Sequence, residues 1–144
     1  MAIKYHPDVG EILICDFSSL STKEPEMTKK RPVIILSPRT RRGSYCTVVP
    51  LSTTAPLPVQ LWNMRLRVNL PNPYSAPEVW VKGDMLYTVS FQRLSPFKVG
   101  KDEFGNRLYQ KHTVSPEELN KVWQCVFNGL GLYRLAKDID KSTD

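Results

Sequence analysis

An arginine and a serine stand at the outer ends of two short apolar segments that are separated by a polar loop. Arg31 comes just before the apolar run at residues 33–36, and Ser52 comes just after the run at residues 47–51. A guanidinium group offers a planar fork of donors that matches a phosphate group, and a hydroxyl group can donate or accept a hydrogen bond beside it. If the fold brings these two side chains together, they can bind a phosphodiester.

The two apolar runs have the features of paired β-strands. Each run is four to five residues long and rich in β-branched residues, and the loop between them contains Pro38 and Gly43. Short runs bounded by turn residues indicate buried strands. Antiparallel pairing puts the start of one strand beside the end of the next. We therefore predict that Arg31 and Ser52 are neighbours at one rim of a sheet.

Further strands are indicated by apolar runs and by alternation with period two. Residues 62–69 alternate most regularly, so that Arg65 and Arg67 share the outer face of their strand. Two prolines within residues 54–60 exclude a central strand there. The predicted strands cover residues 11–17, 62–69, 79–84 and 85–95, and a small hairpin covers residues 97–109.

One helix is predicted near the C-terminus. Ser115 is a favourable N-cap, Pro116 suits the first helical position, and Glu118 completes a capping box. Apolar residues then recur at helical spacing through residues 119–130, and they belong to the core or to a dimer contact. Short, proline-punctuated strands and one packed helix predict a mainly β (α+β) fold, a small bent antiparallel β-barrel with a C-terminal helix.

Composition indicates one soluble domain. With 144 residues, 41% hydrophobic and 24% charged, the chain is long enough for one core and short for two. We expect the domain at residues 1–132 and a frayed tail at residues 133–144. No run has the length of a membrane span and the N-terminus lacks the apolar block of a signal peptide, so we expect a cytoplasmic protein with no membrane contact. The three cysteines are expected to be buried and inert, with no metal site: Cys15, Cys46 and Cys125.

Positive charge is concentrated beside the first hairpin. The chain carries a net charge of +6, and residues 23–42 hold seven lysines and arginines against two glutamates. A local basic patch attracts polyanions, nucleic acid above all, through phosphate contacts and counterion release. Charge alone leaves open the alternative of a solvated loop that only keeps the protein soluble.

Several motifs in order resemble the PemK/MazF family of toxin–antitoxin toxins. They are GEILICDF, RPVIILSP, VVPLSTT, WVKGD and VSPEEL, and together they span nearly the whole chain. The resemblance implies an SH3-like barrel of the PemK/CcdB type and a homodimeric, sequence-selective endoribonuclease. It also implies cleavage of single-stranded RNA without a metal or other cofactor, and neutralisation by a cognate antitoxin.

The resemblance also implies roles for individual residues. Arg31 matches the arginine of the RP motif and is expected to clamp a phosphate, and Ser52 matches the residue that closes the VPLS strand. Glu26 matches an acid in the first loop and Asp84 an aspartate after the late strand, and either is a candidate general base. These four residues are the predicted catalytic set. Contacts to RNA are predicted for Lys30, Arg39, Arg41, Arg42, Thr53, Arg65, Arg67 and Lys82.

Each of these residues also has a purely structural interpretation. Arg31 can pair with Glu26 or with a carbonyl group, and the Ser52 hydroxyl can bond local backbone at the end of a strand. The basic residues can all be solvated. Three aromatic residues either stack on bases or belong to the core, which is the commoner place for aromatics on alternating strands: Trp62, Trp80 and Tyr87.

Two other functions stay open at this stage. The first is a same-fold toxin of the CcdB type that poisons a protein such as gyrase and leaves RNA intact. The second is a basic RNA-binding module without catalysis, in which loss of Arg31 would weaken binding and its salt dependence only modestly.

Overall fold

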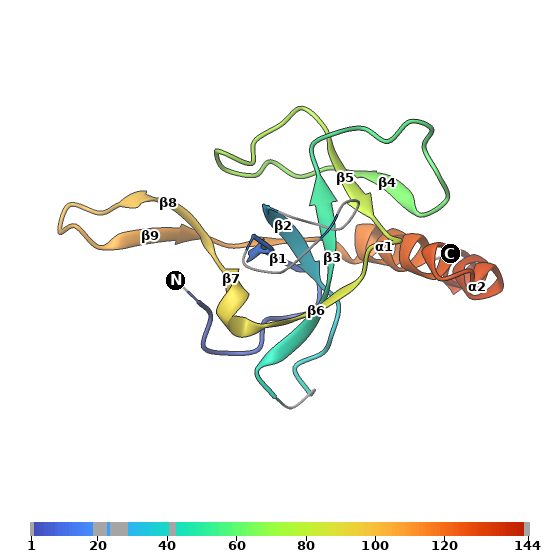
Figure 1. The fold of residues 1–144 in the computed structure, drawn as a ribbon, viewed down its shortest axis with the longest axis horizontal. Helices are drawn as coiled ribbons and strands as arrows, with labels where there is room; N and C mark the ends of the chain where they lie inside the picture. The colour runs from blue at the N-terminus through green and yellow to red at the C-terminus, as the bar shows by residue number, and fades with distance from the viewer. Residues whose placement is uncertain (1, 19–22, 24–28, 41–42, 143–144) are drawn as a thin grey trace.

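The protein is a curled antiparallel β-sheet with helices packed on one face (Figure 1). The structure is a computed structural model and describes residues 2–18, 23, 29–40 and 43–142. The strands are β1 (Glu11–Asp16), β2 (Lys30–Ile35), β3 (Tyr45–Ser52), β4 (Asn63–Leu66), β5 (Val79–Lys82), β6 (Tyr87–Ser90), β7 (Leu94–Ser95), β8 (Phe97–Lys101), β9 (Arg107–Gln110) and β10 (His112–Thr113). The helices are the 3₁₀ turn η1 (Phe91–Arg93), α1 (Pro116–Gly129) and α2 (Tyr133–Ser142).

The main sheet has eight strands, in which the order β10-β1-β2-β3-β5-β4 forms the principal path. Strand β6 adds to β3 and strand β7 adds to β1, so both long strands change partners along their length and the sheet curls. A separate two-stranded arm, β8–β9, projects on the side opposite to the helices (Figure 1). The predicted mainly β fold and its first hairpin are therefore confirmed.

Strand β2 is buried on both faces, and this accounts for its unbroken apolar sequence. Its residues 32–35 are all buried, and successive side chains enter two different cores. The helix-side core lies between the sheet and α1 and includes Ile34, Val49, Leu51, Val79, Val81, Val122 and Val126. The β6-side core covers the other face and includes Cys15, Phe17, Val33, Ile35, Cys46, Val48, Val89, Phe91 and Leu94.

The predicted C-terminal helix is confirmed, with one change at its N-terminus. The Ser115 hydroxyl accepts a hydrogen bond from the Glu118 N–H at 3.2 Å, as an N-cap should. The Glu118 carboxylate, however, accepts a hydrogen bond from the Arg67 N–H at 3.1 Å. This contact ties the first turn of α1 to the chain just after β4.

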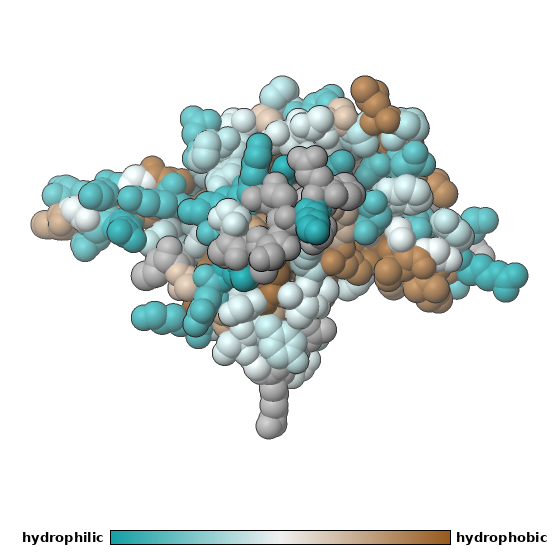
Figure 2. Space-filling view, in the orientation of Figure 1, coloured by the Kyte–Doolittle hydropathy of each residue, from teal (hydrophilic) through white to brown (hydrophobic). Residues whose placement is uncertain are grey.

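Two sequence-based expectations were wrong. The strand predicted over residues 85–95 ends at Ser90, because the Ser90 hydroxyl caps η1 by accepting from the Gln92 N–H. The frayed tail predicted at residues 133–144 contains α2, whose Ala136 is buried. Leu130, Leu132 and Leu135 stay exposed near the helices, where Figure 2 shows apolar surface. Among the described residues, no helix combines the length and apolar character needed to cross a membrane.

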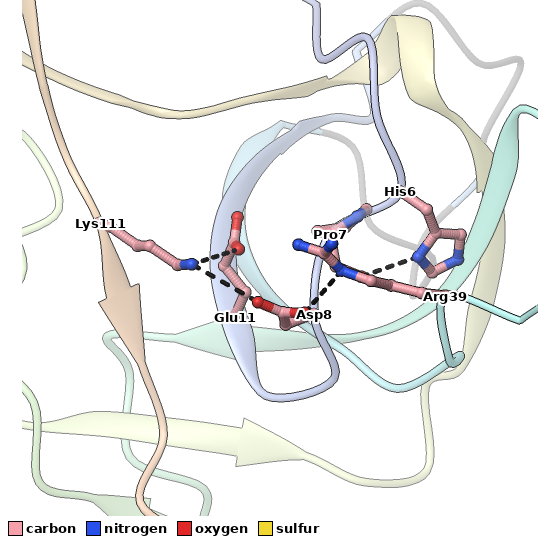
Figure 3. Close-up of polar contacts among 6 residues, drawn as sticks. All are labelled: His6, Pro7, Asp8, Glu11, Arg39 and Lys111. Atoms are coloured by element: carbon pink, nitrogen blue, oxygen red, sulfur yellow. Dashed lines mark hydrogen bonds and ion pairs between the residues drawn. The ribbon is translucent and has the colours of Figure 1, made fainter.

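A group of charged residues that includes a buried carboxylate joins three segments of the chain at the end of β2 that lies away from Arg31 (Figure 3). The Glu11 side chain is only 3% exposed, and its Oε1 atom lies 3.5 Å from the Lys111 ammonium nitrogen. Asp8 lies 3.5 Å from the same ammonium group and 2.6 Å from Nε of Arg39. Within the part of the chain that the structure describes, no hydrogen bond reaches Glu11 Oε1, so the carboxylate depends on Lys111 for its counter-charge.

Replacing Lys111 with methionine is therefore expected to destabilise the fold. The change leaves a buried carboxylate without its cation, and the midpoint of thermal unfolding should fall by roughly 2–6 °C. Thermal unfolding followed by circular dichroism measures the shift. Lys101→Met, at an exposed position on the arm, is the control, and Glu11→Gln should restore the stability of the Lys111→Met protein. Equal midpoints for Lys111→Met and Lys101→Met would contradict this role.

Candidate functional site

The pairing of β2 with β3 brings Arg31 and Ser52 together. The register joins Val33 to Pro50 and Ile34 to Val49, and its continuation puts Arg31 directly opposite Ser52. Opposed residues of antiparallel strands project from the same face. Both side chains line one cavity of about 570 Å³. The prediction that Arg31 and Ser52 are neighbours is therefore confirmed.

Arg31 keeps part of its donor capacity free within the described structure. Its side chain is partly buried, and its Nε–H group is fully buried with no hydrogen-bond partner among the described residues. A buried donor without a partner is costly, so a ligand that accepts from it gains that energy. Glu26, the expected partner or base, lies outside the described residues.

The Ser52 hydroxyl is held in place by the chain that follows it. The residue is 7% exposed, and its oxygen accepts a hydrogen bond from the Thr54 N–H at 3.1 Å. This local contact is the structural interpretation considered above, and it coexists with a place in the cavity wall. The same hydroxyl also donates to the Thr54 carbonyl oxygen, but at 3.5 Å, the long limit of a hydrogen bond, so a ligand in the cavity can compete for this proton.

Lys82 and Asp84 complete the charged lining of the cavity. Lys82 lies on the same face of β5 as Trp80, and Asp84 is exposed in the turn that follows β5. Among the described residues, the cavity therefore combines the cations of Arg31 and Lys82, the Asp84 carboxylate and the Ser52 hydroxyl, contributed by three strands and a turn. The segment after β3 and the start of β4 supply most of the remaining wall, with Thr54, Pro56, Leu57, Pro58, Gln60, Trp62 and Asn63, and Met85 adds to it from the turn after β5.

Two glycines that sequence reasoning did not connect to the site hold this turn against α1. A Cβ atom on Gly83 would lie 2.6 Å from the Cys125 carbonyl oxygen, and one on Gly129 would lie 2.7 Å from the Gly83 carbonyl oxygen. The Gly83 N–H also donates to the Trp62 carbonyl at 2.8 Å. The turn that carries Asp84 can reach the cavity only because neither glycine has a side chain.

The other residues predicted to bind RNA are spread around the molecule. Arg65 shares the cavity face of the sheet and lies two strands from Ser52, with Arg67 exposed nearby. Thr53 is exposed beyond the end of β3, and Lys30 is the cross-strand neighbour of Asp16 on β1. Arg39 forms an ion pair with Asp8 (Figure 3), beyond the end of β2 that lies away from Arg31. Arg41 and Arg42 lie outside the described residues.

Cys15 lies opposite Arg31 on β1 but is not poised as a nucleophile. Burial raises the pKa of the Cys15 thiol to about 12, and the nearby Arg93 guanidinium offsets only part of that effect. Burial likewise raises the pKa of Cys125 to about 11. A thiolate is the reactive form of cysteine, so both thiols are inert at neutral pH.

A larger cavity of about 660 Å³ lies between the two helices and β4. Its lining includes Met64, Cys125, Tyr133 and Ala136, together with the exposed ends of lysine side chains. We assign the functional site to the smaller cavity, because that cavity combines a partly buried guanidinium, a hydroxyl and a carboxylate.

Comparisons with known proteins place the chain in a family. Residues 8–126 match the model of the PemK-like, MazF-like toxin of type II toxin–antitoxin systems. The chain belongs to this family. It is also 32% identical over 114 residues to the uncharacterized protein YifN of Escherichia coli (strain K12), a match that covers 66% of this chain and 76% of YifN.

Solved structures of toxins share the fold. An endoribonuclease in complex with its cognate antitoxin, from a mycobacterial species, has 21% identity and a TM-score of 0.58, covering 88% of this chain and 97% of that chain. MazF from Deinococcus radiodurans has 18% identity and a TM-score of 0.59, and the match covers 89% of this chain and 99% of that chain. The PemK/MazF resemblance inferred from the motifs is thus confirmed, and α2 lies beyond the matched residues.

Substituting Gly83 with alanine tests the contact between the turn and α1. The added methyl group has no space beside the Cys125 and Trp62 carbonyl groups, so the free energy of unfolding should fall by about 1–3 kcal/mol. Urea unfolding measures the loss. Lys121→Ala, at an exposed position of the same helix, should change the unfolding midpoint little; a Gly83→Ala protein as stable as Lys121→Ala would show that the turn tolerates displacement.

The inert state of the cysteines is tested by thiol titration. At pH 8 the native protein should react slowly with a colorimetric disulfide reagent, because the pKa values of Cys15 and Cys125 lie well above that pH and all three thiols are buried. Unfolding in urea should release three thiols per chain, the number in the sequence. Rapid labelling of Cys15 in the native state would contradict this assignment.

Proposed function

We propose that the protein is an endoribonuclease that cleaves single-stranded RNA without a metal ion. The observation that carries this proposal is the cavity in which Arg31 and Ser52 meet from neighbouring strands, with Asp84 in its wall. Membership of the PemK/MazF-like toxin family supports it, as do structural neighbours that are named endoribonucleases. Messenger RNA in the cytoplasm is the proposed substrate.

The reaction uses the 2′-hydroxyl group of the substrate as its nucleophile. The 2′-oxygen attacks the adjacent phosphorus, and the bond from phosphorus to the 5′-oxygen breaks as the new bond forms. The proton of the 2′-hydroxyl passes to a general base, and the departing 5′-oxygen takes a proton from a general acid or from water. The products are a 2′,3′-cyclic phosphate and a 5′-hydroxyl end.

Arg31 stabilises the charge that builds on the phosphate oxygens. Its planar guanidinium can donate two hydrogen bonds to phosphate, and a guanidinium group does not readily release a proton, so it is a poor base. Ser52 positions the 2′-hydroxyl or a phosphate oxygen. The Asp84 carboxylate lines the same cavity and is a candidate base, with Glu26 as the other candidate. Lys82 adds positive charge beside the phosphate.

The proposed partners follow from the family and from the charge of the chain. Members of type II systems act with an antitoxin, and the mycobacterial neighbour is a complex with its cognate antitoxin. An acidic, partly disordered antitoxin would complement the net charge of +6 and bind rapidly. We also propose a homodimer in which the cavity lined by Arg31 and Ser52 opens into a groove shared by the two subunits.

Purified protein should cut a single-stranded transcript in the presence of excess chelator and leave 5′-hydroxyl ends. Arg31→Ala should lower the cleavage rate by at least about 10²–10³-fold, since it removes the donors that stabilise the transition state. Asp84→Asn and Ser52→Ala should slow cleavage as well. Gel analysis of an end-labelled transcript measures the rates, and mapping of the new ends identifies the chemistry and the preferred sequence.

The control is Arg134→Ala, which removes the same charge from an exposed position on α2. It should cleave as the wild type does. An intact transcript after long incubation with the wild-type protein would refute the proposal. Growth arrest with intact cellular RNA would then favour poisoning of a protein target, and RNA binding without cleavage would favour a binding module.

A further inference from the structure

A tryptophan lies on the cavity face of the sheet, one strand beyond Ser52. Trp80 on β5 is the direct cross-strand partner of Ser52 on β3. Such partners project from the same face, with Cβ atoms about 4.5–5.5 Å apart. The indole side chain therefore starts beside the hydroxyl group that lines the cavity.

Core packing does not account for Trp80. Its neighbours Val79 and Val81 are 2% and 0% exposed and point into the helix-side core. Trp80 points the other way and remains partly exposed, and among the described residues neither core includes it. A large apolar ring that is partly exposed beside a polar cavity is suited to contact a ligand.

The polar atom of the indole is already satisfied by the protein. The Trp80 Nε1–H donates to Glu78 at 3.2 Å, and the other carboxylate oxygen of Glu78 lies 3.9 Å from the Arg65 guanidinium. Arg65 also donates to the Pro77 carbonyl at 3.2 Å. These contacts link the ring to the guanidinium through Glu78, and leave the ring to interact through its π surface.

Arg65 extends the arrangement by one more strand. It is the direct partner of Trp80 on β4, so Arg31, Ser52, Trp80 and Arg65 form one row across β2, β3, β5 and β4. With about 4.8 Å between adjacent strands, the row spans roughly 14 Å. Cations at both ends with an aromatic ring between them match a nucleic-acid chain, in which phosphates alternate with bases along the backbone.

We propose that Trp80 is a nucleobase-stacking subsite, on which the base next to the cleaved phosphate rests while Arg65 contacts a further phosphate. The inference rests on the proposed function, because the phosphate at Arg31 defines which base reaches the ring. Stacking on an aromatic face tolerates every base, so this subsite orients the strand and contributes affinity more than sequence preference.

The test uses single-stranded RNA methylated at every 2′-oxygen, which lacks the attacking hydroxyl and so binds without being cut. Trp80→Ala should weaken binding roughly 5- to 100-fold in fluorescence anisotropy, the range expected for loss of one stacked base. Trp80→Phe keeps a ring and should bind nearly as the wild type does. In wild-type protein the bound RNA should quench tryptophan fluorescence.

The quenching separates stacking from a structural role. Trp80→Phe should lose part of it, because Trp62 in the cavity wall also lies near bound RNA, whereas Trp123→Phe, on α1 beside the helix-side core, should keep it. Unchanged affinity in Trp80→Ala, or unchanged quenching in Trp80→Phe, would overturn the subsite. Binding and quenching as expected, with no cleavage of unmodified RNA, would refute the nuclease and leave the subsite standing. Cleavage of unmodified RNA together with wild-type binding by Trp80→Ala would refute the subsite and leave the nuclease standing.

Discussion

The antiparallel pairing of β2 with β3 is the interaction on which the site depends. Side chains alternate along a strand, so a slip of one residue would move Arg31 to the other face and separate it from Ser52. Burial prevents the slip. Residues 32–35 enter cores on both faces of the sheet, and a shifted register would misplace every one of these side chains.

A second constraint comes from the helix. Its apolar stripe packs on the sheet through Val122 and Val126, and two glycines let its last turns lie against the turn after β5. This contact carries Asp84 to the cavity wall from a segment far from Arg31 in sequence. The carboxylate thus reaches the cavity through close backbone packing, which is a stiffer support than a free loop.

Two basic residues of the first hairpin, Arg31 and Arg39, lie at opposite ends of β2. Arg31 enters the cavity, while Arg39, eight positions later, is bound to Asp8 beyond the other end of the strand. About 13 Å of extended strand separates Arg31 from the last residue of β2, Ile35. Meanwhile Arg65, distant in sequence, joins the row that contains Ser52 and Trp80.

The sequence by itself determined the first hairpin, the meeting of Arg31 with Ser52, the N-cap at Ser115 and the family, because these depend on local patterns and ordered motifs. The tertiary structure alone decided which face Trp80 occupies relative to the cavity and how closely Gly83 approaches α1. It also decided that residues 133–142 form a helix. It decided as well that the Glu118 carboxylate accepts a hydrogen bond from the Arg67 N–H, where the sequence predicted a capping box at the start of its own helix. These features depend on contacts between segments far apart in the chain, and no local pattern of residues encodes the distance between them.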